Sequence, residues 1–329
     1  MIYDKPHLPY DQQVRLLQDR GMVIPDHARA ITELKRTGYY RLSAYWYPYR
    51  RLRPPEPASG TTGMRDDTFI DGTTFSQVIA VYTFDEKLRS TLLEGLEIFE
   101  IALRSRIAYH LGKLDPFAYL DSALLKTSEA DRIRGGAHTQ HEEWLVRFRE
   151  RCEESRSEDY VRHFQTKYDG KLPTWVATEV MNFGMSTRLL SFVPDKIQTK
   201  IAREFGIQRP GDLLSWSRTL NGVRNHCAHH GRIWNRRLTV APALVHANRV
   251  DERIAHLAHV DRADANKIYY SAALLACAIR NAAPHSNWPR TFRTIALKFL
   301  NEDSGSASSV MGFPDSWEHL DLWTEEKQK

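Results

Sequence analysis

The longest helical pattern in the sequence runs over residues 73–112. A segment of this length exceeds an average helix, so it predicts either two consecutive helices or one long helix. Patterns that alternate between apolar and polar residues, as strands do, are hardly visible elsewhere. The chain is therefore predicted to be all-α. The apolar residues at helical spacing in the segment include Leu92, Leu96, Phe99, Ala102 and Leu103.

Shorter segments along the chain carry the same helical signals. The segment "DHARAITELKRTG" begins with Asp26, a capping residue, and ends at Gly38, a common stop. Each of the other segments combines apolar periodicity with polar or glycine boundaries. These segments are residues 138–154, 174–184, 195–206, 211–231 and 266–283.

Composition shifts predict four regions. Residues 54–72 are rich in Pro, Gly, Ser and Thr and are expected to form an exposed loop. This loop separates an N-terminal helical lobe, residues 1–53, from a helical core over residues 73–300. A second break begins the C-terminal tail, residues 301–329. We expect the tail to dock on the core through Trp317 and Trp323.

Charge and cysteine content restrict the functional class. The chain of 329 residues carries a net charge of +5 with a pI near 9.0, which favours an acidic partner such as nucleic acid. Its positive charge is concentrated around residues 41–53 and 224–237. Three widely spaced cysteines form neither a disulfide framework nor a CxxC zinc site, so a reducing cytoplasm is expected. The polar start lacks a signal peptide, and no apolar run is long enough to span a membrane.

The densest group of cations and imidazoles is "NGVRNHCAHHGRIWNRR", residues 221–237. An apolar stripe precedes and enters this group, and Arg224 borders the stripe. Asn225, His226, His229 and His230 occupy the other faces of the last turn, and Gly231 is the expected helix stop. The stripe consists of Leu213, Trp216, Leu220, Val223 and Cys227.

Arginine and histidine are the residue types that RNA cleavage requires. A base must remove the proton of a ribose 2′-hydroxyl, and a cation must stabilise the charge that develops on the phosphate. Histidine titrates near neutral pH, and arginine grips phosphate oxygens in two places. This chemistry needs no metal or other cofactor and yields a 2′,3′-cyclic phosphate.

Helix geometry restricts how the two groups meet. On an ideal helix, Arg224 and His229 point roughly 140° apart. Either the helix breaks before His229, or a second copy of the motif from another subunit completes the site. The second possibility predicts a homodimer.

The segment "RNHCAH", residues 224–229, resembles the signature of the HEPN superfamily of RNA-processing domains. The surrounding chain resembles the bacterial abortive-infection proteins of the AbiD/AbiF type within that superfamily. The resemblance covers residues 8–240 and extends to "MGFPDSWEHLDLW" near the end. The blocks that carry it lie at residues 16–50, 97–111, 172–193 and 224–236.

The resemblance implies a HEPN-like helical bundle with additional N-terminal and C-terminal helices. It further implies a metal-independent endoribonuclease that pairs two motifs in a homodimer and acts on single-stranded RNA as a toxin or anti-phage effector. By position, Arg224 is the phosphate-binding cation, Asn225 its polar neighbour and His229 the acid–base. A cognate RNA or protein antitoxin is implied by the class. Gly231 stands where some HEPN toxins carry a tyrosine that is nucleotidylated, which argues against silencing by that route.

Other residues around the motif have supporting interpretations. His230 lies beside the acid–base, and Arg232 and Arg236 are expected to contact RNA. Glu100 and Arg104 are expected to form an i, i+4 pair, and Glu100 or Glu97 could orient Arg224.

A second group of candidate RNA-binding cations lies in "GYYRLSAYWYPYRRLR", residues 38–53. Aromatic rings that stack bases beside Arg41, Arg50 and Arg51 would suit single-stranded RNA. Equally, the aromatic residues lie at helical spacing and could be core, with the arginines as the exposed part.

Three alternatives to the nuclease remain open. The cations could simply cap the end of a helix and offset its dipole. His226, Cys227, His229 and His230 could bind a metal, although their crowding on one turn gives poor tetrahedral geometry. The chain could also be a catalytically inactive RNA-binding or scaffold module with the same fold. No GxSxG, Walker, GxGxxG or HExxH motif occurs, so the common hydrolase, nucleotide-binding and zinc-protease classes are excluded.

Overall fold

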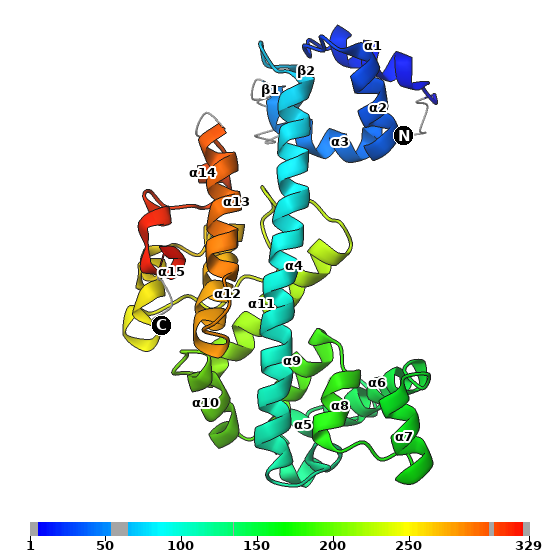
Figure 1. Cartoon of the computed structure of the whole chain (residues 1–329), viewed down its shortest axis with the longest axis vertical. Coiled ribbons are helices and arrows are strands. Elements are labelled where there is room, and N and C mark those ends of the chain that lie inside the picture. Colours follow the sequence, from blue (N-terminus) through cyan, green and yellow to red (C-terminus); the bar gives the residue numbers. More distant parts are fainter. Residues whose placement is uncertain (1–5, 54–64, 134, 303–305, 325–329) are drawn as a thin grey trace. The chain divides into compact units, whose positions relative to one another are not determined.

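The computed structural model describes residues 6–53, 65–133, 135–302 and 306–324 (Figure 1). It is mostly helical, at 67% helix, with a small two-stranded hairpin, which confirms the predicted all-α class. The chain divides into two compact units, Met1–Lys87 and Leu88–Lys329. No helix of the described residues is both long enough and apolar enough to cross a membrane.

The first unit begins with three short helices. They are α1 (Tyr10–Asp19), α2 (His27–Thr37) and α3 (Tyr39–Trp46). The Asp26 side chain caps α2 by accepting a hydrogen bond from the Arg29 amide at 2.9 Å, and Gly38 ends the helix with a φ of 89°. These are the boundaries that the sequence predicts for this helix.

A hairpin follows α3. Strand β1 (Arg50–Leu52) pairs antiparallel with β2 (Arg65–Phe69), which lies within the segment 54–72 that the sequence predicts as a loop. Residues 54–64 of that segment lie outside the described residues. Only Phe69 of β2 is buried, so the strand has no apolar alternation by which the sequence could reveal it.

Residues 75–112 form a single continuous helix, α4 (Phe75–Gly112). This settles the alternative between one helix and two. The division between the two compact units falls inside α4, after Lys87. In the second unit, Leu92, Leu96 and Leu103 are at most 1% exposed and recur at helical spacing, as the sequence predicts.

The second unit is built from many helices, of which α12 lies at the centre. Every residue of α12 from Ile268 to Ile279 is buried, and α12 contacts α11, α13 and α15. The helix α13 runs alongside it (Figure 1). Buried on all sides, α12 shows no polar face.

The longer helices are α6 (Gln140–Glu154), α7 (Asp159–Lys167), α8 (Thr174–Val180), α9 (Phe183–Phe192), α10 (Asp195–Glu204), α11 (Pro210–Ala228), α12 (Ile268–Ala282) and α13 (Trp288–Glu302), and the short ones are α5 (Thr127–Ala130), α14 (Ser306–Met311) and α15 (Asp321–Thr324).

The helix predicted over residues 174–184 is two helices. The first, α8, ends at Val180, and Asn182 caps α9 by accepting a hydrogen bond from the Met185 amide at 2.9 Å. An asparagine at a helix start competes with helix continuation because its side chain replaces the backbone acceptor.

The described C-terminal residues pack on the second unit. Trp317 and Trp323 are at most 3% exposed, and both rings contact the ring of Tyr269 in α12. The Arg280 guanidinium donates to the carbonyl of Leu322 at 3.0 Å. Residues 303–305 and 325–329 of the predicted tail lie outside the described residues.

Candidate functional site

The motif residues lie on the last turn of α11. Pro210 occupies the first turn of this helix, where its missing N–H costs nothing. The predicted apolar stripe is buried: Leu213, Trp216, Leu220, Val223 and Cys227 are each 1% exposed. This stripe fixes the rotation of α11, so the direction in which each motif residue leaves the helix is set by the core.

The end of α11 differs in detail from the expectation that Gly231 stops the helix. The helix ends at Ala228, and His230 takes the left-handed conformation with a φ of 56°. Gly231 is required for another reason: its amide donates to the His226 carbonyl at 2.7 Å, and a Cβ at position 231 would lie 3.2 Å from that oxygen.

The helix does not break before His229. The His229 amide donates to the Asn225 carbonyl at 3.0 Å, the hydrogen bond of a continuing helix. Arg224 and His229 therefore leave α11 roughly 140° apart. Arg224 is half-buried, whereas Asn225, His229 and His230 are exposed. Within one chain, the guanidinium and the imidazole occupy different faces of the helix.

The charge of Arg224 acts on a buried carboxylate of α4, that of Glu100. Glu100 is 8% exposed and forms the predicted ion pair with Arg104. Burial raises the pKa of Glu100, while the charges of Arg104 and Arg224 lower it and that of Glu97 raises it. Of the two carboxylates predicted as candidates to orient Arg224, Glu100 is buried and Glu97 is exposed, and the role itself stays a prediction.

The loop after α11 brings a second cation to the motif. Burial lowers the pKa of His226, and the nearby charges of Arg236 and His229 lower it further. The Nε of Arg236 is buried and has no hydrogen-bond partner among the described residues. Arg232 is half-buried in the same loop. The arrangement concentrates positive charge beside His229.

The lowered pKa values of two histidines predict acid sensitivity. His226 and His256 both have pKa values below the usual 6.5, and burial is the main cause in each. When the pH falls through 6.5, the unfolded chain binds protons that the folded chain resists, so the stability present above that pH is lost below it. We expect the thermal unfolding midpoint to fall between pH 7.5 and about 5.5. His256→Gln should flatten this dependence, and an unchanged slope in that variant would contradict the assignment.

The candidate cations of the first unit are partly neutralised. Arg50 pairs with Asp67 at 3.1 Å, and Arg51 pairs with Asp71 at 2.6 Å. Arg41 is exposed. Of the neighbouring apolar and aromatic residues, Leu42, Tyr45 and Trp46 are buried, while Tyr40 is 91% exposed. Tyr40 and Arg41 are the residues of this segment most open to a ligand.

The histidines and cysteine of the motif do not form a metal cluster. In the described part of the chain, no group of three or more His, Cys, Asp or Glu residues is arranged to hold a metal ion. Cys227 is 1% exposed on the buried stripe, on the opposite side of α11 from His229.

Sequence reasoning missed the polar residues at the cleft between α9 and α11. This cleft is lined by Gly184, Thr187, Arg188, Arg218 and Asn221. One signal was present: Arg218 lies within roughly 20° of His229 around the axis of α11. No local pattern could reveal Thr187 and Arg188, because they belong to another helix.

The comparisons with known proteins identify the family. Residues 32–235 match the family described as Abi-like protein. The chain belongs to this family. The match includes the end of α11, so the Abi-like region contains Arg224, Asn225 and His229 together with the carboxylate of Glu100. No curated protein and no solved structure matches the Abi-like chain.

Proposed function

We propose that the chain is a metal-independent endoribonuclease of the HEPN type that acts in abortive infection and cuts single-stranded RNA. One observation carries the proposal. The Abi-like match includes a helix end that presents an exposed imidazole, His229, five residues after a half-buried guanidinium, Arg224, whose charge lowers the pKa of the buried Glu100.

Each residue has a role that follows from its surroundings. His229, exposed at the helix end, removes the proton from the ribose 2′-hydroxyl, whose oxygen attacks the phosphorus. The P–O5′ bond breaks, and the departing 5′-oxygen takes up a proton, so that a 2′,3′-cyclic phosphate and a 5′-hydroxyl remain. Arg224 binds the phosphate and stabilises its transition-state charge. Asn225, exposed beside Arg224, donates hydrogen bonds to the same phosphodiester, and Glu100 positions the guanidinium from behind.

The separation of Arg224 and His229 around α11 favours a site shared by two chains. Because one chain directs them to different faces, the arginine of one protomer and the histidine of its partner would meet at one phosphate. His230, Arg232 and Arg236 supply further polar contacts near the strand. The proposal thus includes a homodimer with closed two-fold symmetry.

Cleavage of end-labelled single-stranded RNA in EDTA tests the proposal. We expect the full chain to cut and to leave a 2′,3′-cyclic phosphate, because no step requires a metal. His229→Ala and Arg224→Ala should each lower the rate by about 10²–10⁴-fold, the usual contribution of a positioned acid–base or oxyanion group. Arg203→Ala, an exposed arginine on α10, is the matched control and should retain the rate.

Other outcomes have clear meanings. Loss of cutting in EDTA would indicate a metal-dependent nuclease and contradict the proposal. RNA binding without cutting, equal in all the variants, would indicate an inactive RNA-binding module.

In cells, expression of the chain alone should arrest growth, and His229→Ala should relieve the arrest; co-expression of a cognate RNA or protein antitoxin would do the same.

A further inference from the structure

The cleft between α9 and α11 has the chemistry of an anion site. Its volume is about 170 Å³. The described residues that line it include two arginines, one amide and one hydroxyl, and none of them is a carboxylate. Arginine recognises phosphate oxygens through its planar fork, so the lining suits a phosphate group.

A buried hydroxyl in the cleft has no partner. Thr187 is 5% exposed, and its Oγ1 forms no hydrogen bond with any described residue. A buried hydroxyl without a partner costs free energy, and a ligand oxygen at the cleft would satisfy it. This observation points to a ligand independently of the charge.

Both helices contribute cations to the cleft. Arg218 projects from α11, is exposed, and forms no ion pair with a carboxylate of the described residues. Arg188 projects from α9, where its guanidinium lies 4.9 Å from the centre of the Phe192 ring. Stacking on a ring orients the guanidinium.

The backbone adds space and polarity at the cleft. Gly184 is the second residue of α9, so its N–H lacks an acceptor within the helix. A Cβ at this position would lie 3.4 Å from Asn182 Oδ1 and 3.5 Å from Asn221 Nδ2. Glycine therefore keeps the space between two amide side chains open.

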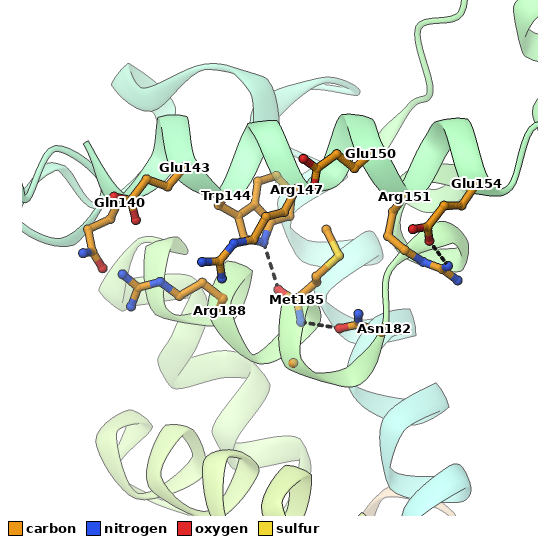
Figure 2. A pocket seen from close by; sticks show the side chains of 11 residues that line it. Gln140, Glu143, Trp144, Arg147, Glu150, Arg151, Glu154, Asn182, Met185 and Arg188 are labelled. Atoms are coloured by element: carbon orange, nitrogen blue, oxygen red, sulfur yellow. Dashed lines mark hydrogen bonds and ion pairs between the residues drawn. The ribbon is translucent and has the colours of Figure 1, made fainter. Parts of the chain in front are cut away.

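A larger cavity of about 590 Å³ continues from the cleft, because Gly184 and Arg188 line both. Figure 2 shows Arg147 of α6 and Arg188 of α9 reaching into this cavity from its two sides. Carboxylates also line the cavity: Glu154 pairs with Arg151, and Glu143 and Glu150 stand on α6.

Helix geometry connects the cleft with the motif. Around the axis of α11, Asn225 and His229 each lie within roughly 20° of Arg218, and Asn221 lies roughly 40° from Asn225. His229 is eleven residues beyond Arg218, or about 16 Å along the axis. A phosphate at the cleft is thus not the one that is cut, but a strand lying along this polar face reaches both places.

We propose that the α9–α11 cleft binds a backbone phosphate of the RNA, held by Arg188, Arg218, Thr187 and Asn221, a few nucleotides from the bond that is cut. This rests on the proposed function for the identity of the ligand. The cleft positions the strand along α11, and the four residues take no part in the bond-breaking step.

Binding of a 2′-O-methyl single-stranded RNA, which cannot be cut, tests this proposal. Fluorescence anisotropy over a range of salt concentrations gives both the Kd and its salt dependence. Arg218→Gln should weaken binding about tenfold and reduce the salt slope by about one. Thr187→Val should weaken it about threefold to tenfold without lowering the melting temperature, because the hydroxyl has no partner within the described protein.

Two exposed arginines outside the cleft serve as matched controls. Arg203→Gln on α10 and Arg149→Gln on α6 remove the same charge from the same unit and should change the Kd by less than about twofold. Equal losses in these controls and in Arg218→Gln would overturn the proposal, since general charge would then explain binding. An unchanged Kd in Arg218→Gln would overturn it as well.

Two further measurements separate the sources of failure. If inorganic phosphate binds tightly at the cleft and Arg218→Gln abolishes only that binding, the cleft serves free phosphate and the RNA assignment is wrong. If native RNA is never cut but Arg218→Gln and Thr187→Val weaken RNA binding as expected, the proposed nuclease activity is wrong and the proposed phosphate site in the cleft is supported. If RNA is cut, Arg218→Gln should raise KM and leave kcat unchanged.

Discussion

Mixing the Arg224→Ala and His229→Ala proteins is expected to restore RNA cleavage to about a quarter of the native rate. Each variant alone lacks one of the two groups in both sites of its dimer. In a mixed dimer, one site combines the intact arginine of one protomer with the intact histidine of its partner, and the other site lacks both. Half of the dimers are mixed after random exchange, and half of their sites are active.

The double variant Arg224→Ala, His229→Ala supplies the control for this experiment. Mixed with an equal amount of native protein, it yields mixed dimers in which each site has lost one group, so only the native quarter of the dimers should cut RNA, whereas half of the sites would remain active if each chain carried a complete site. Recovery of RNA cleavage in the mixture of the two single variants, neither of which cuts alone, would indicate a site shared between chains. No recovery after verified exchange of protomers would show that each chain carries a complete site.

Replacing Gly95 by alanine is expected to destabilise the second unit by about 2–4 kcal/mol, or roughly 5–10 °C in melting temperature. The Trp288 indole lies against the α4 backbone at Gly95, and its Nε1 donates to the Thr91 carbonyl at 2.6 Å. A Cβ at position 95 would stand 2.6 Å from that nitrogen. The indole must therefore move, and a buried hydrogen bond is lost.

Gly222→Ala is the matched control, because nothing lies within 4 Å of a Cβ built at this position of α11. In that variant the better helix propensity of alanine should raise stability by about 1 kcal/mol. A double-mutant cycle of Gly95→Ala with Trp288→Phe should show coupling, since the smaller ring relieves the clash. Strictly additive effects would contradict the proposed cause.

The sequence predicted the elements whose signals are local. The stripe from Leu213 to Cys227 and the cap at Asp26 depend on residues three or four apart, so periodicity revealed them. The sequence did not predict the hairpin, because Phe69 is the only buried residue of β2. The sequence did not predict the helix break after Val180, because nothing in the sequence marks Asn182 as the residue that caps the next helix.

The candidate site divides in the same way. Arg224, Asn225 and His229 were predicted from one short segment, and the Glu100–Arg104 ion pair was predicted from its i, i+4 spacing. The pairing of Arg51 with Asp71 and the meeting of Thr187 with Arg218 join residues that are distant in the sequence. Such contacts are decided by packing, and a single sequence holds no periodic signal for them.

Glu100 is buried and pairs with Arg104, and the charge of Arg224 also lowers its pKa. One counterion shared by two cations leaves a surplus of positive charge that water screens poorly at this depth. An incoming anion would complete the neutralisation. If the chain binds RNA as proposed, a phosphate of the strand supplies the second negative charge, and part of the binding energy comes from these two cations and their single counterion.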